Sequence, residues 1–238
     1  MDTLDAAFDR VAARRKTLEV YDDGAVGSEL EEQFSTRNVE VVRRTFPSRE
    51  FLVVRDADGE FQGALGIETL RAIVSPETHP PWVLSDAGSD ASELFDFLDN
   101  TLFTAYDRRQ MLAVSREIEE RAWRADAGTL YAGFQNAGAF RAQVPVYDRF
   151  ARESGVAVRI FIEDGWNEDL DDGIDVVSDT GGEIGRYWFV LFDGGGSDLN
   201  AGGLLAEERE PGTYYGFWTH DPEFVEEITS YLRRTYRL

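Results

Sequence analysis

The segment from residue 107 to residue 135 constrains the fold more than any other part of the chain, because it predicts a long helix followed directly by a strand. Asp107 and Gln110 have the spacing of a capping box, in which each side chain satisfies a backbone N–H group of the first turn. The apolar residues that follow share one helical face: Met111, Val114, Ile118 and Ala122. Residues 129–132 form the apolar strand. A helix that packs one face against such a strand predicts a layered α/β fold.

The rest of the chain continues this alternation of helices and strands. The predicted helices lie near residues 4–14, 28–34, 68–74, 91–99, 144–154 and from 222 onward. The predicted strands lie at residues 17–21, 39–45, 51–55, 60–65, 156–162, 174–177, 187–192, 201–206 and 214–218. Ser28 with Glu31 predicts a capping box, Gly155 a helix C-cap, and Asp221 a helix N-cap. We therefore expect an α/β fold with a mixed, largely antiparallel sheet and packed helices.

Three prolines mark a loop at residues 75–90, which we take as the boundary between two modules. The predicted division is an amino-terminal α/β extension at residues 1–74 and a second module at residues 91–238. Residues 50–68 and 187–208 share an order of apolar strand, Asp-Gly-rich turn and return strand. This order predicts two pseudo-repeated halves, but any two hairpins of an α/β protein can look alike, so both interpretations stay open.

The charge of the chain is extreme for a folded domain, at −22, and Lys16 is the only lysine among 24 basic residues. Salt shortens the distance over which such charges repel each other. The composition therefore predicts a halophilic, archaeal protein, or else an acidic protein with basic partners. An acidic chain of this kind argues against direct nucleic-acid binding, which needs basic residues. The absence of a signal sequence and of a long apolar run predicts a cytoplasmic protein without a membrane segment.

Residue patterns typical of catalysis are missing from the sequence. There is no cysteine, no glycine-rich phosphate loop and no nucleophile paired with a base. The acidic loop at residues 167–173 lacks the ligand spacing of a calcium loop. An enzyme of unrecognised type remains as an alternative, and it would use Glu119, His220 or Asp221 if these side chains met in one cleft.

Several short motifs together carry a resemblance to a known family. They are Ser115-Arg116-Glu117-Ile118-Glu119, Gly133-Phe134-Gln135, Trp188-Phe189-Val190, and the seven residues from Gly216 to Pro222. With these motifs, residues 95–237 resemble the DICT sensory domain, which is named for diguanylate cyclases and two-component systems. The resemblance implies a non-catalytic module of signal transduction that regulates a separate output protein, such as a kinase, a cyclase or a transcription regulator. It implies no catalytic residue and names no cofactor, ligand or oligomeric state.

Aromatic residues within these motifs are the candidates for a ligand pocket, together with nearby polar residues. The candidate ligand-binding residues are Arg116, Glu119, Trp123, Phe134, Gln135, Trp188, Trp218 and Thr219. Rings of this kind also fill ordinary cores, where each buries about 150–250 Å². Arg116 and Glu119 can likewise form a plain ion pair along a helix. The sequence therefore leaves open whether these residues bind a ligand or serve packing.

Overall fold

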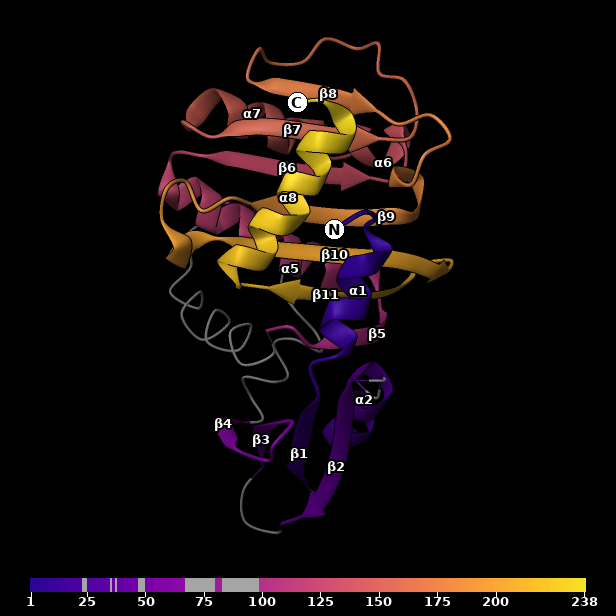
Figure 1. Cartoon of the computed structure of the whole chain (residues 1–238), viewed down its shortest axis with the longest axis vertical. Coiled ribbons are helices and arrows are strands. Elements are labelled where there is room, and N and C mark those ends of the chain that lie inside the picture. Colours follow the sequence, from indigo (N-terminus) through magenta and orange to yellow (C-terminus); the bar gives the residue numbers. More distant parts are fainter. Residues whose placement is uncertain (23–24, 35, 37, 47–49, 67–79, 83–98) are drawn as a thin grey trace.

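The computed structural model describes residues 1–22, 25–34, 36, 38–46, 50–66, 80–82 and 99–238, and their strands form two sheets (Figure 1). The larger sheet has seven strands: β5 Leu102–Tyr106, β6 Thr129–Phe134, β7 Ala157–Ile162, β8 Ile174–Ser178, β9 Tyr187–Phe192, β10 Gly202–Glu210 and β11 Thr213–Thr219. Their order is β5-β11-β10-β9-β6-β7-β8. The pairs β6–β7 and β7–β8 are parallel, and the other pairs of this sheet are antiparallel. The parallel part of the sheet therefore ends at β6, and the antiparallel part begins at β9.

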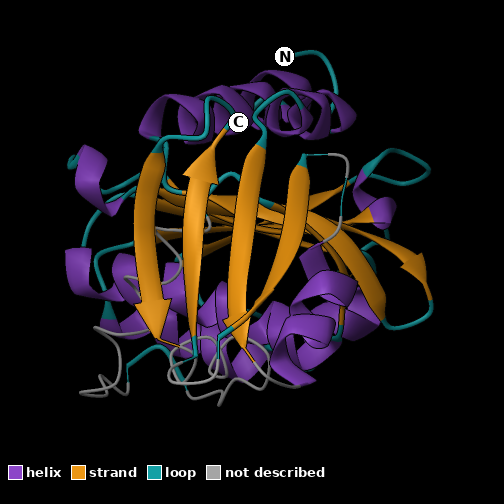
Figure 2. Cartoon of the chain, turned by 90° about the horizontal axis from the view of Figure 1, so that it is seen from below, coloured by secondary structure: helices purple, strands orange, loops and turns teal. Residues whose placement is uncertain are grey.

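Helices cover both faces of the seven-stranded sheet, as the two views show (Figures 1 and 2). One face carries α5 Arg108–Ala125, α6 Ala137–Arg141 and α7 Val144–Glu153, and the other carries α1 Asp5–Ala12 and α8 Pro222–Tyr236. Two short 3-10 helices, η1 Ile184–Arg186 and η2 Asp198–Asn200, flank β9. All six residues of β9 are buried, because helices lie above and below this strand. The result is a three-layer α/β/α arrangement.

The long helix α5 forms as its sequence predicts. The Asp107 carboxylate accepts a hydrogen bond from the Gln110 N–H, and the Gln110 side chain accepts one from the Asp107 N–H, which completes the capping box. Its predicted apolar face is buried against the sheet. The helix ends at Asp126, which adopts a left-handed conformation with φ of 52°.

The smaller sheet has the order β2-β1-β3-β4 and is formed by residues near the amino terminus. Its strands are β1 Lys16–Asp22, β2 Val39–Thr45, β3 Phe51–Asp56 and β4 Phe61–Gly66, and α2 Ala25–Phe34 connects the parallel strands β1 and β2. Phe34 of α2 meets Tyr106 of β5 edge to face, with ring centroids 5.9 Å apart. Because the apolar residues of this sheet belong to the same core cluster as the α5 face, the two sheets share a continuous core.

Asn38 joins the two sheets at their junction. Its side-chain nitrogen donates to the carbonyl oxygens of Val11 and Arg14, each at 3.0 Å, and its side-chain oxygen accepts from the Leu102 N–H at 3.3 Å. Only 1% of Asn38 is exposed. One buried amide thus ties the end of α1 and the start of β5 to the smaller sheet.

Most predicted elements are confirmed, and the fold is mixed α/β with mostly antiparallel pairing. Strand β5 was not predicted, and neither was the short helix α6. The predicted helix at 68–74 and most of the one at 91–99 lie outside the described residues. Across the part of the chain that the structure describes, no helix has the length and apolar character needed to cross a membrane.

Two predicted caps are wrong. Ser28 lies inside α2, and the Gly27 N–H in the first turn donates instead to the Asp22 carboxylate at 2.7 Å. Gly155 follows α7, but the C-cap is Ser154 in an extended conformation. A Cβ atom on Gly155 would lie 2.5 Å from the Asp126 carbonyl oxygen, so close packing explains this glycine.

The suggested duplication finds a partial parallel in the strand order. The smaller sheet has the order β2-β1-β3-β4, and the corresponding strands of the larger sheet have the order β8-β7-β9-β10 with β6 inserted after β7. The hairpins at residues 50–68 and 187–208 thus hold similar places, as far as their described residues show. The inserted strand means that β7 and β9 do not pair as β1 and β3 do, so a duplication remains a prediction.

Candidate functional site

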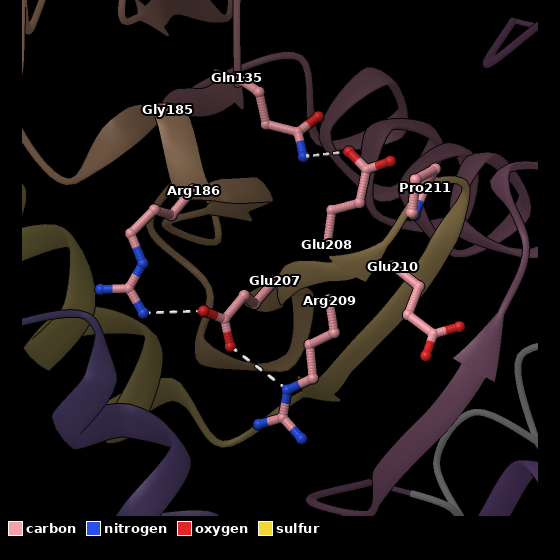
Figure 3. Close-up of a pocket in the computed structure, with 8 residues that line it drawn as sticks. All are labelled: Gln135, Gly185, Arg186, Glu207, Glu208, Arg209, Glu210 and Pro211. Atoms are coloured by element: carbon pink, nitrogen blue, oxygen red, sulfur yellow. Dashed lines mark hydrogen bonds and ion pairs between the residues drawn. The ribbon is translucent and has the colours of Figure 1, made fainter.

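An open groove lies where the parallel and antiparallel parts of the large sheet meet, at the carboxyl ends of β6 and β10 and the start of β9 (Figure 3). Its volume is about 390 Å³. It is lined by Gln135, Gly185, Arg186, Glu207, Glu208, Arg209, Glu210 and Pro211. The chain continues from β6 to β7 and β8 on one side and from β9 to β10 and β11 on the other, so the strand order reverses here. In open α/β sheets, ligands bind at such switch points, outside the carboxyl ends of strands. The groove is therefore the first candidate for a functional site.

Ion pairs on the α1 side organise the groove. The Arg186 guanidinium donates to Glu207 at 2.7 Å, and the Arg209 Nε donates to Glu207 at 3.4 Å (Figure 3). Arg186 also donates to Asp5 of α1 at 3.2 Å. The Tyr187 hydroxyl also donates to Asp5, at 2.7 Å. The Tyr187 hydrogen bond and, more weakly, the Arg186 charge hold the pKa of Asp5 below its usual value against the effect of burial. A chain of alternating charges thus runs from α1 into the groove.

On the α5 side, Gln135 borders both the groove and a small cavity. The Gln135 Nε2 donates to the Glu208 carboxylate at 3.0 Å, and Glu208 also accepts from the Gly212 N–H at 2.7 Å. Behind Gln135 lies a cavity of about 20 Å³. Its lining consists of Arg108, Phe134, Gln135, Ala139, Gln143, Trp188 and Tyr214. Gln135 borders both spaces, so it forms part of the wall between them.

Three aromatic rings form the apolar walls of the cavity. Trp188 and Tyr214 meet at 85° with centroids 5.6 Å apart, and Phe134 packs on Phe140 at 5.3 Å. The Trp188 Nε1 donates to the Ser115 hydroxyl at 3.1 Å, and that hydroxyl donates to the Met111 carbonyl at 2.9 Å. Ser115, the first residue of the helical motif, therefore fixes the tryptophan ring at the cavity.

Gly133, which precedes Phe134, has a packing role on the opposite face. It pairs with Phe189 of β9, and a Cβ atom there would lie 2.1 Å from the Phe189 ring. A side chain at this position would collide with the ring in the middle of the α1–α8 core. The motif Gly133-Phe134-Gln135 thus combines one packing residue with two residues that line the cavity.

Arg116 and Glu119 form an ion pair beneath the cavity. Glu119 is 1% exposed and also accepts a hydrogen bond from the Tyr147 hydroxyl at 2.6 Å, while Arg116 donates to the Gln143 side chain at 2.6 Å. Burial and the Glu119 charge raise the pKa of Tyr147 well above its usual value. These contacts connect α5 to α7. Within this group of side chains, Gln143 is the one that lines the cavity.

The remaining candidate residues lie elsewhere. Trp123 packs on Phe150 of α7 at 5.3 Å, and Trp218 stacks on Phe103 of β5 at 5.8 Å. Thr219 is fully buried, and its hydroxyl accepts from the Asp221 N–H at 3.1 Å. Of the eight candidates, Phe134, Gln135 and Trp188 line the cavity together, and Arg116 and Glu119 lie next to it. Trp123, Trp218 and Thr219 do not join them.

The residues of the enzyme alternative are not brought together by a shared set of contacts. Glu119 pairs with Arg116 on the α5 face, whereas the Asp221 carboxylate caps α8 and accepts from Arg14 at 3.0 Å on the α1 side. The His220 N–H donates to Asp99 at 2.6 Å. Within the described ranges, no group of three or more histidines and acids could hold a metal ion.

Groove residues Arg186, Glu207 and Glu208 and cavity residues Arg108 and Tyr214 were not predicted as site residues. They come from the ends of β10 and β11, from the 3-10 helix η1 and from the first turn of α5, which meet only in the folded chain. The sequence contained one signal for them, since residues 207–210 follow a long apolar strand at its carboxyl end.

Comparison with known proteins gives one informative match. Residues 93–209 match the profile of DICT, described as a sensory domain in diguanylate cyclases and two-component systems. The segment from Gly216 to Pro222 lies beyond that match, although the sequence resemblance extended to it. No curated protein matches the sequence.

Among solved structures, a polyphosphate kinase from Porphyromonas gingivalis is similar at 12% identity and a TM-score of 0.38. The alignment covers 93% of this chain and 43% of that kinase. A similarity this low carries no argument about fold or activity. The groove residues from Gln135 to Arg209 and the cavity residues other than Tyr214 lie within the matched range of the family profile. Residues 93–209 of this chain are therefore similar to the DICT family of sensory domains.

Proposed function

We propose that this chain is a non-catalytic sensory module, which binds a small ligand at the groove beside Gln135 and reports its presence to a separate signalling protein. The observation that carries the proposal is the position of the groove. It lies at the point where the strand order of the sheet reverses, and six of its eight lining residues belong to the segment that matches the DICT sensory domain.

The ion pairs of the groove support a route for the signal. Arg186 and Glu207 line the groove, and Arg186 also binds Asp5 of α1, which lies outside the DICT match. A ligand that changes the partners of Arg186 would change how firmly α1 is held on the sheet. A ligand shifts an equilibrium only by its difference in affinity for the two states, and these ion pairs would supply that difference.

The partner in this proposal is a separate output protein of a signalling system, such as a kinase, a cyclase or a transcription regulator. The description of the family, which names diguanylate cyclases and two-component systems, supports this choice. The acidic character of the chain favours a cytoplasm rich in salt, so the proposal places the protein in the cytoplasm of a halophilic archaeon.

A thermal-shift screen of the full chain against small metabolites in concentrated KCl tests the proposal. We expect at least one compound to raise the melting temperature, and Gln135→Ala to abolish that increase. Arg152→Gln is the matched control, because Arg152 lies on α7 and pairs with Asp171, away from the groove. Pull-down from a halophile lysate with and without the compound then identifies the output protein. Failure of every compound, together with no ligand-dependent partner, would contradict the proposal.

A further inference from the structure

An arginine without a carboxylate partner lies at the small cavity behind Gln135. Arg108 is exposed, lines the cavity and makes no ion pair with any described residue, although the chain contains 46 acidic residues. Its guanidinium carbon lies over the Trp188 ring, 6.0 Å from the centroid, so its charge is held at the cavity. Arg108 is also the first residue of α5, where the helix dipole disfavours a positive charge. Neither an ion pair nor the stability of the helix therefore explains this arginine.

The Tyr214 hydroxyl is a second donor without a partner at this cavity. Tyr214 is only 5% exposed and lines the cavity, but its hydroxyl makes no hydrogen bond within the described part of the chain. Buried hydroxyl groups normally have a partner. Burial and the Glu208 charge raise the pKa of Tyr214 above its usual value, and the Arg108 charge opposes this change. The hydroxyl therefore keeps its proton and can donate to an acceptor bound at the cavity.

Gln143 supplies a third donor, because Arg116 fixes the orientation of its amide. A guanidinium has donors only, so the Gln143 atom that Arg116 contacts at 2.6 Å is the oxygen. Arg116 is itself held by the buried carboxylate of Glu119. The Gln143 Nε2 is left as a donor at the cavity that the side chain lines, and no described residue accepts from it. Three groups that can only donate or are free to donate thus border one small space.

The size of the cavity limits what enters it. Its volume of about 20 Å³ has room for about one water molecule, and therefore for one oxygen atom of a larger group. Because the exposed side chain of Arg108 forms part of the lining, the rest of such a group can lie outside at the surface. One oxygen can therefore bind while Gln135 and the aromatic rings stay in place.

We propose that this cavity binds an anionic group, which is either a carboxylate or a phosphate. One oxygen of the anion enters the cavity and accepts hydrogen bonds from Tyr214 and Gln143, and a second oxygen pairs with Arg108. Hydrogen bonds from an arginine to such groups are charge-assisted and strong. Glu208 lies outside the lining and accepts from Gln135; its charge disfavours an anion, and Arg108 together with the positive end of α5 offsets it. The site goes beyond the proposed function, since the anion occupies the cavity and not the groove.

Titration of the full chain with potassium phosphate and with potassium acetate, at constant ionic strength in KCl, tests the inference. The indole N–H resonance of Trp188, which Trp188→Phe assigns, reports on the cavity. We expect a saturable shift with at least one anion, and binding about tenfold weaker in Arg108→Gln, as for one lost hydrogen bond to a charged group. Tyr214→Phe, which removes only the hydroxyl, should weaken binding about fivefold. Arg109→Gln is the matched control and should leave the affinity unchanged, because Arg109 is the next exposed residue of α5 and does not line the cavity.

The two anions separate the two sources of the charge. Tighter binding of phosphate assigns the site to phosphorylated compounds, and tighter binding of acetate assigns it to carboxylates. Two results would overturn the inference. One is the absence of a saturable shift with both anions, and the other is equal weakening in Arg108→Gln and Arg109→Gln with no effect of Tyr214→Phe, as for a diffuse surface charge. Both results concern the cavity alone, and the thermal-shift screen tests the groove separately.

Discussion

Lys16 provides a quantitative test of how the two sheets are joined. It is the first residue of β1, and its Nζ donates a hydrogen bond to the Asp99 carbonyl oxygen just before β5. Burial lowers the pKa of Lys16 to about 8, from an ordinary value of 10.5. The nearby Asp99 charge opposes this change, and Arg14 reinforces it. The only lysine of the chain is therefore held where its charge is unfavourable.

The effect on stability depends on pH in a defined window. Below about pH 8 both the folded and the unfolded chain carry the Lys16 proton, and above about pH 10.5 neither does. Between these values the unfolded chain binds more protons, so the free energy of unfolding rises with pH. The pKa difference corresponds to about 3.4 kcal/mol in total. About 2.5 kcal/mol of this gain falls between about pH 7 and about pH 10.

Urea unfolding of the wild type and of Lys16→Met at one KCl concentration measures this contribution. The variant keeps an unbranched apolar side chain but cannot titrate. We expect the wild type to gain about 2–3 kcal/mol relative to the variant between about pH 7 and about pH 10. Tyrosines whose pKa is raised titrate in both proteins, so their effect cancels in the difference. A difference that stays constant within about 0.5 kcal/mol over this range would refute the reasoning.

Three further substitutions test the packing. Trp218→Ala should lower the free energy of unfolding by about 3–5 kcal/mol in chemical denaturation, because the ring is 1% exposed. A decrease below about 1 kcal/mol would show that the contacts of this ring do not stabilise the fold. Gly133→Val should lower the free energy of unfolding by about 1–3 kcal/mol or more through collision with Phe189. Thermal melting that matches the wild type would rule out the collision. Asn38→Leu should lower the free energy of unfolding by about 3 kcal/mol or more, since several buried backbone groups lose their hydrogen-bond partner. Unchanged stability in calorimetry would argue that Asn38 does not connect the two sheets.

The elements that the sequence predicts well are those whose signals are local. The Asp107 capping box and the apolar face of α5 lie within one helix, and both are confirmed. Strand β5 was missed because it has five residues and its partner, β11, follows about a hundred residues later in the chain. The C-cap predicted at Gly155 is wrong for a similar reason, which is a contact between residues far apart in the sequence. The residue that requires a glycine here is Asp126, in another loop.

The candidate site likewise contains some residues that the sequence motifs mark and others that they do not. Phe134, Gln135 and Trp188 carry motif signals and lie together at the cavity. The one signal for Glu207 and Glu208 is their place after an apolar strand, and this signal does not single them out in a chain that contains 46 acidic residues. Glu207 and Glu208 line the groove because they lie at the end of β10, near the point where the strand order reverses between β6 and β9. Only the assembled sheet reveals this position.

The central claim is that a ligand binds at the groove beside Gln135. The indole N–H resonance of Trp188, which lines the cavity behind Gln135, tests it most directly. The chain has five tryptophans, and Trp188→Phe assigns one resonance by its loss. Addition of the compound that stabilises the protein in the thermal-shift screen is predicted to shift the Trp188 resonance and leave those of Trp123 and Trp218 in place. Shifts at Trp123 or Trp218 with an unchanged Trp188 resonance would contradict the account.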